Sequence, residues 1–249
     1  MLFTRATAEW INRVNQKHKQ LADLQLSAAQ QEKLNRRVET EFVYSTLKLE
    51  GDDKEDIRED VIARLVSAHE GDETAESNKA AKALLRSLRY VADLARAKGK
   101  GAELSIDILL RLHNVERSPS GFREGPGDNP ARRLASPEVL PAMIDNACQW
   151  YRAESFTELN PVEQASIVLL RLLELQPFDQ QNVRTALVAS SLFTLRRGLP
   201  PIIIRPERRA EYQSAIEEGY RMNTKPMVEL IAEALERSLT NAIEEAARR

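Results

Sequence analysis

PVEQASIVLLRLLEL (161–175), QPFDQQNVR (176–184) and TALVASSLFTLRRG (185–198) follow one another directly, and together they decide the fold class of this chain. The first segment is apolar on nearly all sides, as expected for a helix at the centre of a bundle. The third segment belongs to a second helix, predicted over about 180–197, that ends at Gly198. The sequence therefore predicts an all-α fold built around two helices joined by a polar loop.

Helical signals continue through much of the remaining chain, where apolar residues recur every three or four positions. Ser27 and Gln30 form a capping box at the start of one helix. One expected helix extends from Ser27 past Leu49, a second covers 84–95 and ends near Gly99, and a third covers 106–114. Three more are expected to start at Ser136-Pro137, at Pro206 and at about Lys225.

The segments between these helices are read as loops of one domain. The polar stretches 51–56 and 69–77 lack the length and composition of domain linkers, and 199–204 is expected to be extended because its prolines disfavour a helix. Gly, Pro, Asp and Asn cluster between Pro119 and Leu134, where a small β-hairpin is expected. We therefore expect a single domain over 1–249.

The composition argues against several classes of protein. The 36 Lys and Arg residues against 38 Asp and Glu give a formal charge of −2, unlike a dedicated nucleic-acid-binding protein. The single cysteine, Cys148, allows no internal disulfide, which fits a reducing compartment. Residues 1–10 lack the apolar run of a signal peptide, and no run is long enough to span a membrane. We expect a cytoplasmic protein with no nucleic-acid partner and no membrane contact.

The loop 176–184 resembles the signature of the Fic (Fic/DOC) family, His-x-Phe-x-(Asp/Glu)-Gly-Asn-Gly-Arg-x-x-Arg. Phe178, Asn182 and Arg184 match three of its eight defined positions. Upstream, TLKLEG (46–51) resembles the inhibitory motif (Ser/Thr)-x-x-x-Glu-(Gly/Asn) of members that carry an inhibitory helix before the Fic core. The resemblance implies that Glu50 is the inhibitory glutamate.

Other parts of the family follow in the family's order. Gly121, Phe122 and Arg123 with the turn-rich stretch after them resemble the flap, a hairpin that docks a target protein. Segment 137–150 resembles the helix after the flap, and 199–220 resembles the family's ending. The resemblance covers about 5–240 and implies a Fic-type helical bundle with a small β-hairpin flap. It divides the chain into an inhibitory-type helical region at about 1–100 and a Fic core at about 101–240.

Working members transfer AMP from ATP to a hydroxyl of a target protein, and this chain lacks two groups which that chemistry needs. Gln176 stands at the position of the histidine that acts as general base, and its amide takes up no proton near neutral pH. Loss of a general base typically lowers a rate by roughly 10²–10⁴-fold. Gln180 replaces the acidic residue that holds Mg²⁺, and a neutral amide is a poor ligand for this hard cation.

The phosphate-binding part of the signature is also altered. Gln181 and Val183 replace glycines that expose backbone N–H groups to phosphate, and the β-branched Val183 is a poor choice at a position where φ is expected to be positive. Leu187 replaces the second arginine, which would hold the γ-phosphate and pair with Glu50. Only Asn182 and Arg184 remain as nucleotide-binding candidates, so ATP and Mg²⁺ are expected only if this loop still binds phosphate.

Several of these residues also have a structural interpretation. Phe178 is read as a core anchor, and Asp179 with Asn182 as a pair that caps a helix. Under that hypothesis the Asp179 carboxylate occupies the former phosphate site. Arg184 either holds an anion or forms a salt bridge with Glu50.

Residues outside the signature favour structural roles. His18 is read as part of a solvated face and His113 as a structural side chain. Ser190 and Ser191 lack a partner that would activate them. The arginines at 205, 208 and 209 are read as helix surface, with a weaker case for anion binding, and no His or Cys cluster has metal-ligand spacing.

Three functions follow from these observations. The first is a Fic-family protein, similar to protein adenylyltransferases, that is inactive in ordinary AMP transfer and acts by binding or regulation. The second is a transferase that moves AMP or another phosphate-containing group to a protein hydroxyl by altered chemistry. The third is a helical scaffold whose loop similarity is coincidental. The partner expected for the first is a target protein at the flap, and the residues indicate no particular oligomeric state.

Overall fold

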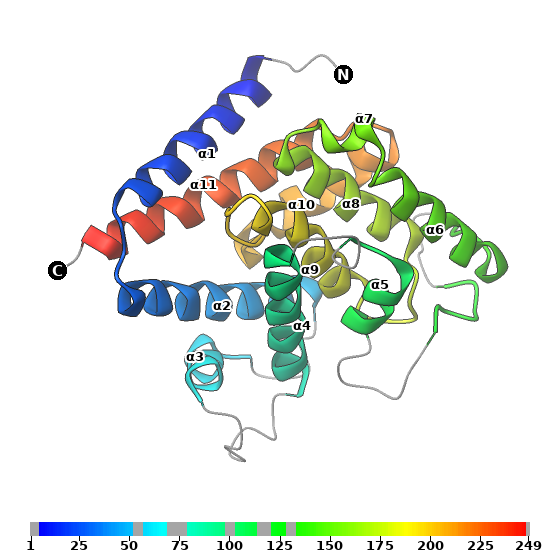
Figure 1. The fold of residues 1–249 in the computed structure, drawn as a ribbon. Coiled ribbons are helices and arrows are strands. Elements are labelled where there is room, and N and C mark those ends of the chain that lie inside the picture. The colour runs from blue at the N-terminus through cyan, green and yellow to red at the C-terminus, as the bar shows by residue number, and fades with distance from the viewer. Residues whose placement is uncertain are drawn as a thin grey trace.

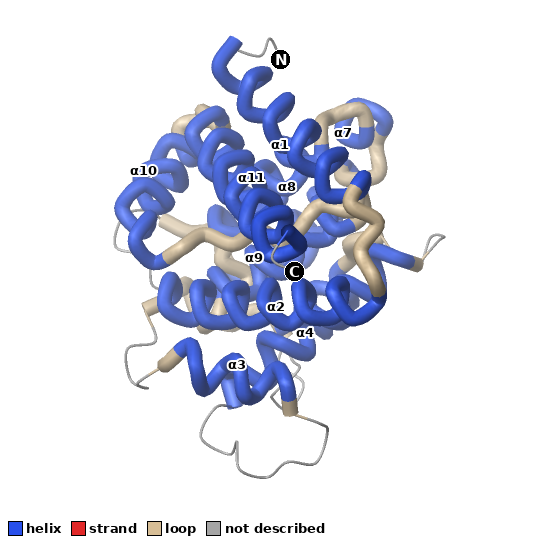
Figure 2. The backbone as a smooth tube through the Cα atoms, turned by 90° about the vertical axis from the view of Figure 1, so that its left-hand side faces the viewer, coloured by secondary structure: helices blue, strands red, loops and turns tan. Residues whose placement is uncertain are grey.

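The computed structural model describes residues 5–51, 57–68, 79–97, 103–113, 121–127 and 133–247, whose regular structure is entirely helical (Figures 1 and 2). The α-helices are α1 (Arg5–Asp23), α2 (Ala28–Glu50), α3 (Glu59–Ser67), α4 (Lys79–Arg96), α5 (Ile106–His113), α6 (Leu140–Trp150), α7 (Glu154–Thr157), α8 (Pro161–Leu175), α9 (Asn182–Leu195), α10 (Arg209–Tyr220) and α11 (Lys225–Ala247). Short 3-10 turns, Pro137–Val139 and Pro206–Arg208, lead into α6 and α10. The predicted all-α class is confirmed.

Helix α8 lies in the middle of the bundle because it is apolar nearly all round. Asn160 caps its start by accepting a hydrogen bond from the Val162 N–H at 2.9 Å, and Glu163 accepts one from the Asn160 N–H at 3.1 Å. This capping box satisfies two backbone donors that have no partner inside the helix. Most side chains of α8 are buried, and the helix packs against α9, α10 and α11.

Helix α9 packs along α8 and is tied to the extended segment after it. Ser191 is buried, and its hydroxyl donates a hydrogen bond to the Leu187 carbonyl at 2.8 Å. The same oxygen accepts a hydrogen bond from the Ile202 N–H at 3.0 Å. This contact fixes 199–204, which contains neither helix nor strand, against the core. Ser190 and Ser191 therefore have structural roles.

The outer helices bring distant parts of the chain together at α9. Helix α1 lies alongside α11, and α4 crosses α2 (Figures 1 and 2). The C-terminal end of α2 contacts the start of α9, and the N-terminal end of α10 lies beside it. Residues that are more than 130 positions apart therefore meet at the loop between α8 and α9.

The small β-hairpin predicted between Pro119 and Leu134 is wrong for the described part of that stretch. Residues 121–127 form bends without a strand, and residues 114–120 and 128–132 lie outside the described residues. The Arg123 N–H donates a hydrogen bond to the Pro177 carbonyl at 2.8 Å, so this main chain pairs with the loop after α8. Pro126 has no N–H to offer a neighbouring strand.

Buried apolar side chains form one cluster that extends from Val14 to Leu239. The cluster includes residues of both the predicted inhibitory-type region and the predicted Fic core. The two predicted loops fall almost wholly outside the described residues, at 52–56 and 69–78. Within the described ranges, every helix is too short or too polar to cross a bilayer. The assignment of a single domain stays a prediction.

Candidate functional site

The loop between α8 and α9 turns at two residues with left-handed backbone conformation. Gln176, with φ of 41°, ends α8, and Gln181, with φ of 62°, stands at the N-cap of α9. A residue with a β-carbon typically pays roughly 1–2 kcal/mol for this conformation, whereas glycine adopts it freely. The backbone at Gln181 thus favours a glycine, the residue that the family signature has at this position.

Val183 differs from that expectation. It lies in the first turn of α9, and its φ is not positive. Its half-buried side chain packs against the core cluster. The replacement of glycine by Val183 therefore brings no backbone strain. It instead places a branched side chain where a glycine would leave the helix start open.

Asn182 holds the loop closed through the backbone of Phe178. Its Oδ1 accepts a hydrogen bond from the Phe178 N–H at 3.0 Å, and its Nδ2 donates one to the Phe178 carbonyl at 2.7 Å. The Phe178 ring is buried and stacks on the His113 ring, with 3.8 Å between centroids and 4° between planes. Phe178 is a core anchor, as predicted, and His113 is part of the same packing.

The predicted capping pair of Asp179 and Asn182 is wrong. The N-cap of α9 is Gln181, and no side chain caps it. Asp179 is exposed, and Asn182 uses both ends of its amide on Phe178. The Asp179 carboxylate therefore does not cap the helix start, because α9 begins two residues later than expected.

Arg184 and Glu50 form a buried ion pair between α9 and the last residue of α2. The Arg184 Nε donates a hydrogen bond to Glu50 Oε2, and the Arg184 N–H lies 3.4 Å from Glu50 Oε1. The side chains are 8% and 14% exposed. The sequence left the salt bridge open as one of two roles for Arg184, and the geometry gives the salt bridge. Glu50 therefore has a partner although the second arginine of the signature is absent.

Leu187, at the position of that second arginine, belongs to the core. Its side chain is 1% exposed. Arginine at this place would have to bury its charge or displace the neighbouring side chains. The loss of the γ-phosphate ligand has thus been accompanied by apolar packing on the same face of α9.

Arg209 fixes the end of α2 from the other side. Its Nη2 donates hydrogen bonds to the Lys48 and Leu49 carbonyls, both at 3.0 Å. These carbonyls belong to the last turn of α2, where helix carbonyls lack partners within the helix. Gly51 ends α2 with φ of 86°, and a β-carbon there would lie 3.1 Å from Arg209 Nη2. Arg209 and Gly51 together fix Glu50 at the start of α9.

The prediction that the arginines at 205, 208 and 209 lie on the helix surface is correct only in part, because they are partly exposed but each contacts another helix. Arg205 Nε lies 2.8 Å from Glu41 Oε1, and Arg208 Nη2 lies 2.9 Å from Glu233 Oε2. The hydrogen bond with Glu233 raises the pKa of Arg208. These side chains connect α10 to α2 and α11, and no sequence pattern distinguished this from exposed charge.

Arg123, predicted as a flap residue, is buried and binds backbone carbonyls. Its Nε donates to the Gln176 carbonyl at 2.9 Å, its Nη1 to Gly125 at 2.7 Å and its Nη2 to Ala135 at 2.5 Å. Burial lowers the pKa of Arg123, and the negative charge of Asp179 opposes that shift. The guanidinium therefore joins the flap segment to the loop. Gly121 and Phe122 precede it, and the Phe122 ring lies 5.8 Å from that of Phe178.

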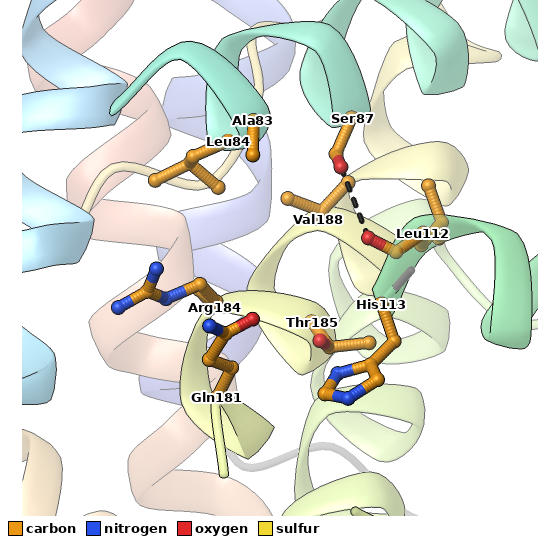
Figure 3. A pocket seen from close by; sticks show the side chains of 9 residues that line it. All are labelled: Ala83, Leu84, Ser87, Leu112, His113, Gln181, Arg184, Thr185 and Val188. Atoms are coloured by element: carbon orange, nitrogen blue, oxygen red, sulfur yellow. Dashed lines mark hydrogen bonds between the residues drawn. The ribbon is translucent and has the colours of Figure 1, made fainter. Parts of the chain in front are cut away.

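A small cavity lined by described residues lies beside the loop. It measures about 10 Å³, which is room for about one water molecule. Gln181, Arg184, Thr185 and His113 are among the residues that line it (Figure 3). Within the described ranges, no three His, Cys, Asp or Glu side chains gather as a metal ion would need. Thr185 is a neighbour that sequence reasoning missed, because it stands in no recognisable pattern, and Arg209 was named without its contact to the end of α2.

Part of this chain is similar in sequence to known proteins. The Fic/DOC family model matches residues 103–194. Protein adenylyltransferase fic-1 of Caenorhabditis elegans is 29% identical over 147 residues, which cover 57% of this chain and 29% of that protein. Protein adenylyltransferase Fic of Drosophila erecta is 26% identical over 143 residues, which cover 55% and 29%. The match thus spans less than a third of these relatives.

Solved structures share the fold over nearly the whole chain. A Fic domain containing signaling protein from Bacteroides thetaiotaomicron superposes with a TM-score of 0.82 at 22% identity, covering 94% of this chain and 97% of that one. Fic-1 from C. elegans superposes with a TM-score of 0.77 at 25% identity, covering 96% and 71%. The helices before the matched region therefore also follow the fold of these proteins.

Proposed function

Residues 103–194 of this chain form a Fic/DOC domain, and we propose that this domain is inactive in ordinary AMP transfer and acts as a binding or regulatory protein. The chain has the fold of the family, and its relatives include protein adenylyltransferases. The proposal concerns what the altered loop can still do.

The observation that carries the proposal is the ion pair of Arg184 with Glu50. Arg184 is the only arginine of the signature that this chain retains, and its guanidinium is buried against the carboxylate. Glu50 also stands beside the Arg184 N–H, one of the donors at the helix start that would face phosphate. An ATP phosphate would therefore have to displace a buried carboxylate from its partner.

Two further features support the same conclusion. Leu187 is packed in the core, so no second arginine can replace Arg184 when Glu50 is bound. The cavity beside the loop holds about one water molecule, far below the 300–1,000 Å³ typical of ligand pockets. The loop is thus filled by its own side chains.

The family's base position in the loop also lacks a side chain that can accept a proton. Gln176 offers a neutral amide at the family's base position. His113 lies in the same cavity wall, but its ring is stacked on Phe178 and 7% exposed. These observations favour the inactive protein over a transferase that works by altered chemistry.

Two measurements on the full chain test the proposal. Isothermal titration with ATP and Mg²⁺ should show no binding with a dissociation constant below about 1 mM. Incubation with α-labelled ATP and a mixture of proteins should transfer no label, either to them or to the chain itself. Transferred label would overturn the proposal in favour of the altered-chemistry transferase, and micromolar ATP binding would show that the loop still holds a nucleotide.

A set of variants identifies the cause of inactivity. Glu50→Ala alone frees Arg184, and it should still transfer no label because the base is missing. The combined variant Q176H/Q180D/Q181G/V183G/L187R with Glu50→Ala should regain ATP binding at least tenfold over the parent chain. A folded combined variant without this gain would favour a helical scaffold. Arg197→Ala, at the opposite end of α9, is the matched control and should behave as the parent.

A further inference from the structure

Helix α4 carries a row of cations along one side. Lys79, Lys82 and Arg86 follow one another at spacings of three and four residues, so they lie on one face of the helix, and Tyr90 continues the row one turn later. Lys79 and Arg86 are exposed, and Lys82 is half-buried. The apolar side chains of α4 lie on its other sides and pack in the core. The row therefore forms a positively charged strip on the surface of the protein.

Helix α5 adds a fourth cation to this strip. The two helices are joined where the Ser87 hydroxyl donates a hydrogen bond to the Leu112 carbonyl at 3.0 Å (Figure 3). Arg111 of α5 is exposed, and its guanidinium carbon lies 4.1 Å from the centre of the Tyr90 ring. This contact places the positive charge of α5 beside the row on α4. We call the four cations the basic face: Lys79, Lys82, Arg86 and Arg111.

Among the described residues, no carboxylate lies within salt-bridge distance of any cation of the basic face. The other two arginines of α4 do have such partners. Arg89 pairs with Glu39 at 2.8 Å, and Arg96 pairs with Asp93 at 2.7 Å. The basic face therefore holds four positive charges that the described part of the chain does not neutralise.

The aromatic ring beside these cations favours a protein partner over a nucleic acid. Proteins that bind single-stranded nucleic acid stack its bases on open aromatic rings. One side of the Tyr90 ring is covered by Arg111, and the residue is half-buried. The whole chain has a formal charge of −2, whereas nucleic-acid-binding domains are typically basic. The groups that fit the basic face are therefore the carboxylates of an acidic protein segment.

We propose that the basic face binds an extended, acidic segment of a partner protein. Lys79, Lys82 and Arg86 are separated by about 4.5 and 6 Å along the helix axis, at a rise of about 1.5 Å per residue. In an extended chain, every second side chain recurs on the same side after about 6.6 Å. A segment with an acidic residue at every second position thus offers one carboxylate to each cation in turn, and the long side chains of the cations take up the difference in spacing.

The proposal does not rest on the inactivity of the signature loop, because the basic face contains no residue of 176–184. Each exposed ion pair contributes little on its own, since water and salt screen it. Several carboxylates must therefore bind together, and the affinity should depend strongly on salt.

Fluorescence anisotropy of the full chain with labelled peptides tests the proposal. The probe is a Glu-Ser repeat of about ten residues, and the control is a Gln-Ser repeat of the same length. At low salt the Glu-Ser peptide should bind at least tenfold more tightly than the Gln-Ser peptide, and about 0.5 M NaCl should abolish the difference. Equal affinities for the two peptides at low salt, or no Glu-Ser binding up to about 1 mM, would overturn the proposal. Tighter binding of an oligothymidylate of equal charge would overturn it in favour of a nucleic acid.

Two charge-reversal variants locate the site. K79E/R86E changes two exposed residues of the basic face and should lower the affinity for the Glu-Ser peptide at least tenfold. K19E/R197E makes the same change of net charge at two exposed residues of α1 and of the end of α9, and it should change the affinity by less than about twofold. Circular dichroism checks the fold of each variant. Equal losses in the two folded variants would show that only the net charge matters and would contradict the site.

The competing occupant is the chain's own segment 70–76, which has four acidic residues and precedes α4 in the sequence. The variant E70Q/D72N/E73Q/E76Q distinguishes the two. Binding of the Glu-Ser peptide by the parent chain supports a partner protein. Binding that occurs only in this variant would assign the basic face to the chain's own acidic segment and would overturn the proposal.

Discussion

The two ends of helix α9 differ in how much space the surrounding side chains leave beside them. At the N-terminal end, Arg184, Glu50 and Asn182 use their polar atoms on one another and on the backbone, and about 10 Å³ remains. At the C-terminal end, a groove of about 440 Å³ remains, with Leu34, Leu88 and Leu239 among its lining residues. The end where the family signature lies is closed, and the end without a signature is open. A sequence motif therefore marks where a ligand is expected, while side-chain packing decides where one fits.

The largest effect is expected at the ion pair. Arg184→Met should lower the free energy of unfolding by about 3 kcal/mol, because it leaves the Glu50 carboxylate buried without its cation. Urea denaturation measures this change. Adding Glu50→Gln should recover part of the loss, as a double-mutant cycle would show. Arg197→Met, at the open end, should stay within about 0.5 kcal/mol of the parent. Equal changes in the free energy of unfolding for Arg184→Met and Arg197→Met would contradict the difference between the two ends of α9.

Arg123 gives the next effect, because it holds the closed end together from the flap side. Arg123→Met should lower the free energy of unfolding by about 2 kcal/mol, since three partly buried carbonyls lose their donor. Hydrogen exchange should become faster around 176–182. Arg133→Met is the matched control, because Arg133 is exposed and follows in the same connection. Unchanged hydrogen exchange around 176–182 in Arg123→Met would show that Arg123 does not hold this loop in place.

The two former glycine positions should respond in opposite directions. Gln181→Gly should raise the free energy of unfolding by about 0.5–1 kcal/mol, because it relieves the left-handed residue at the N-cap. Val183→Gly should lower it by about 1 kcal/mol, because this position is helical and half-buried. Thermal or urea melts decide the sign. Destabilisation by both would mean that Gln181 is not strained.

The smallest effect concerns the reactivity of Cys148, which is far in sequence from both ends of α9. Its labelling shows whether substitutions at those ends change the structure only locally. Burial raises the pKa of its thiol to about 11, above the ordinary value of 9.0. The associated stability is fully present below about pH 9 and is lost as the pH rises toward 11. At pH 8 a thiol reagent should therefore react slowly with the folded chain and quickly in urea. Fast labelling of a folded Gln181 or Arg197 variant would show that its effect is not local.

Local sequence signals predicted much of the fold. The capping box of Ser27 and Gln30 is present as expected, and α8 covers the predicted 161–175. These features depend on residues within a few positions of each other. The start of α9 and the flap were predicted less well, because Gln181 takes a conformation unusual for its type and Arg123 pairs with a loop 53 positions away.

The candidate site was predicted in its residues and only partly in its partners. The signature identified Arg184 and the upstream inhibitory motif identified Glu50, and a salt bridge between them was one of two roles left open for Arg184. That pair joins residues 134 positions apart, and the Arg209 contact spans 160. Such contacts arise only when α2, α9 and α10 pack together, so spacing along the chain carries no signal for them.

The sequence by itself determined the helical class, the central helices and the absence of a base, a metal-binding acid and a second arginine from the signature. These follow from residue type and local periodicity. Only the tertiary structure decided that the remaining arginine is neutralised by Glu50 and that an apolar groove opens at the far end of the same helix. Both depend on which side chains distant segments bring together, and that is fixed by packing around the core.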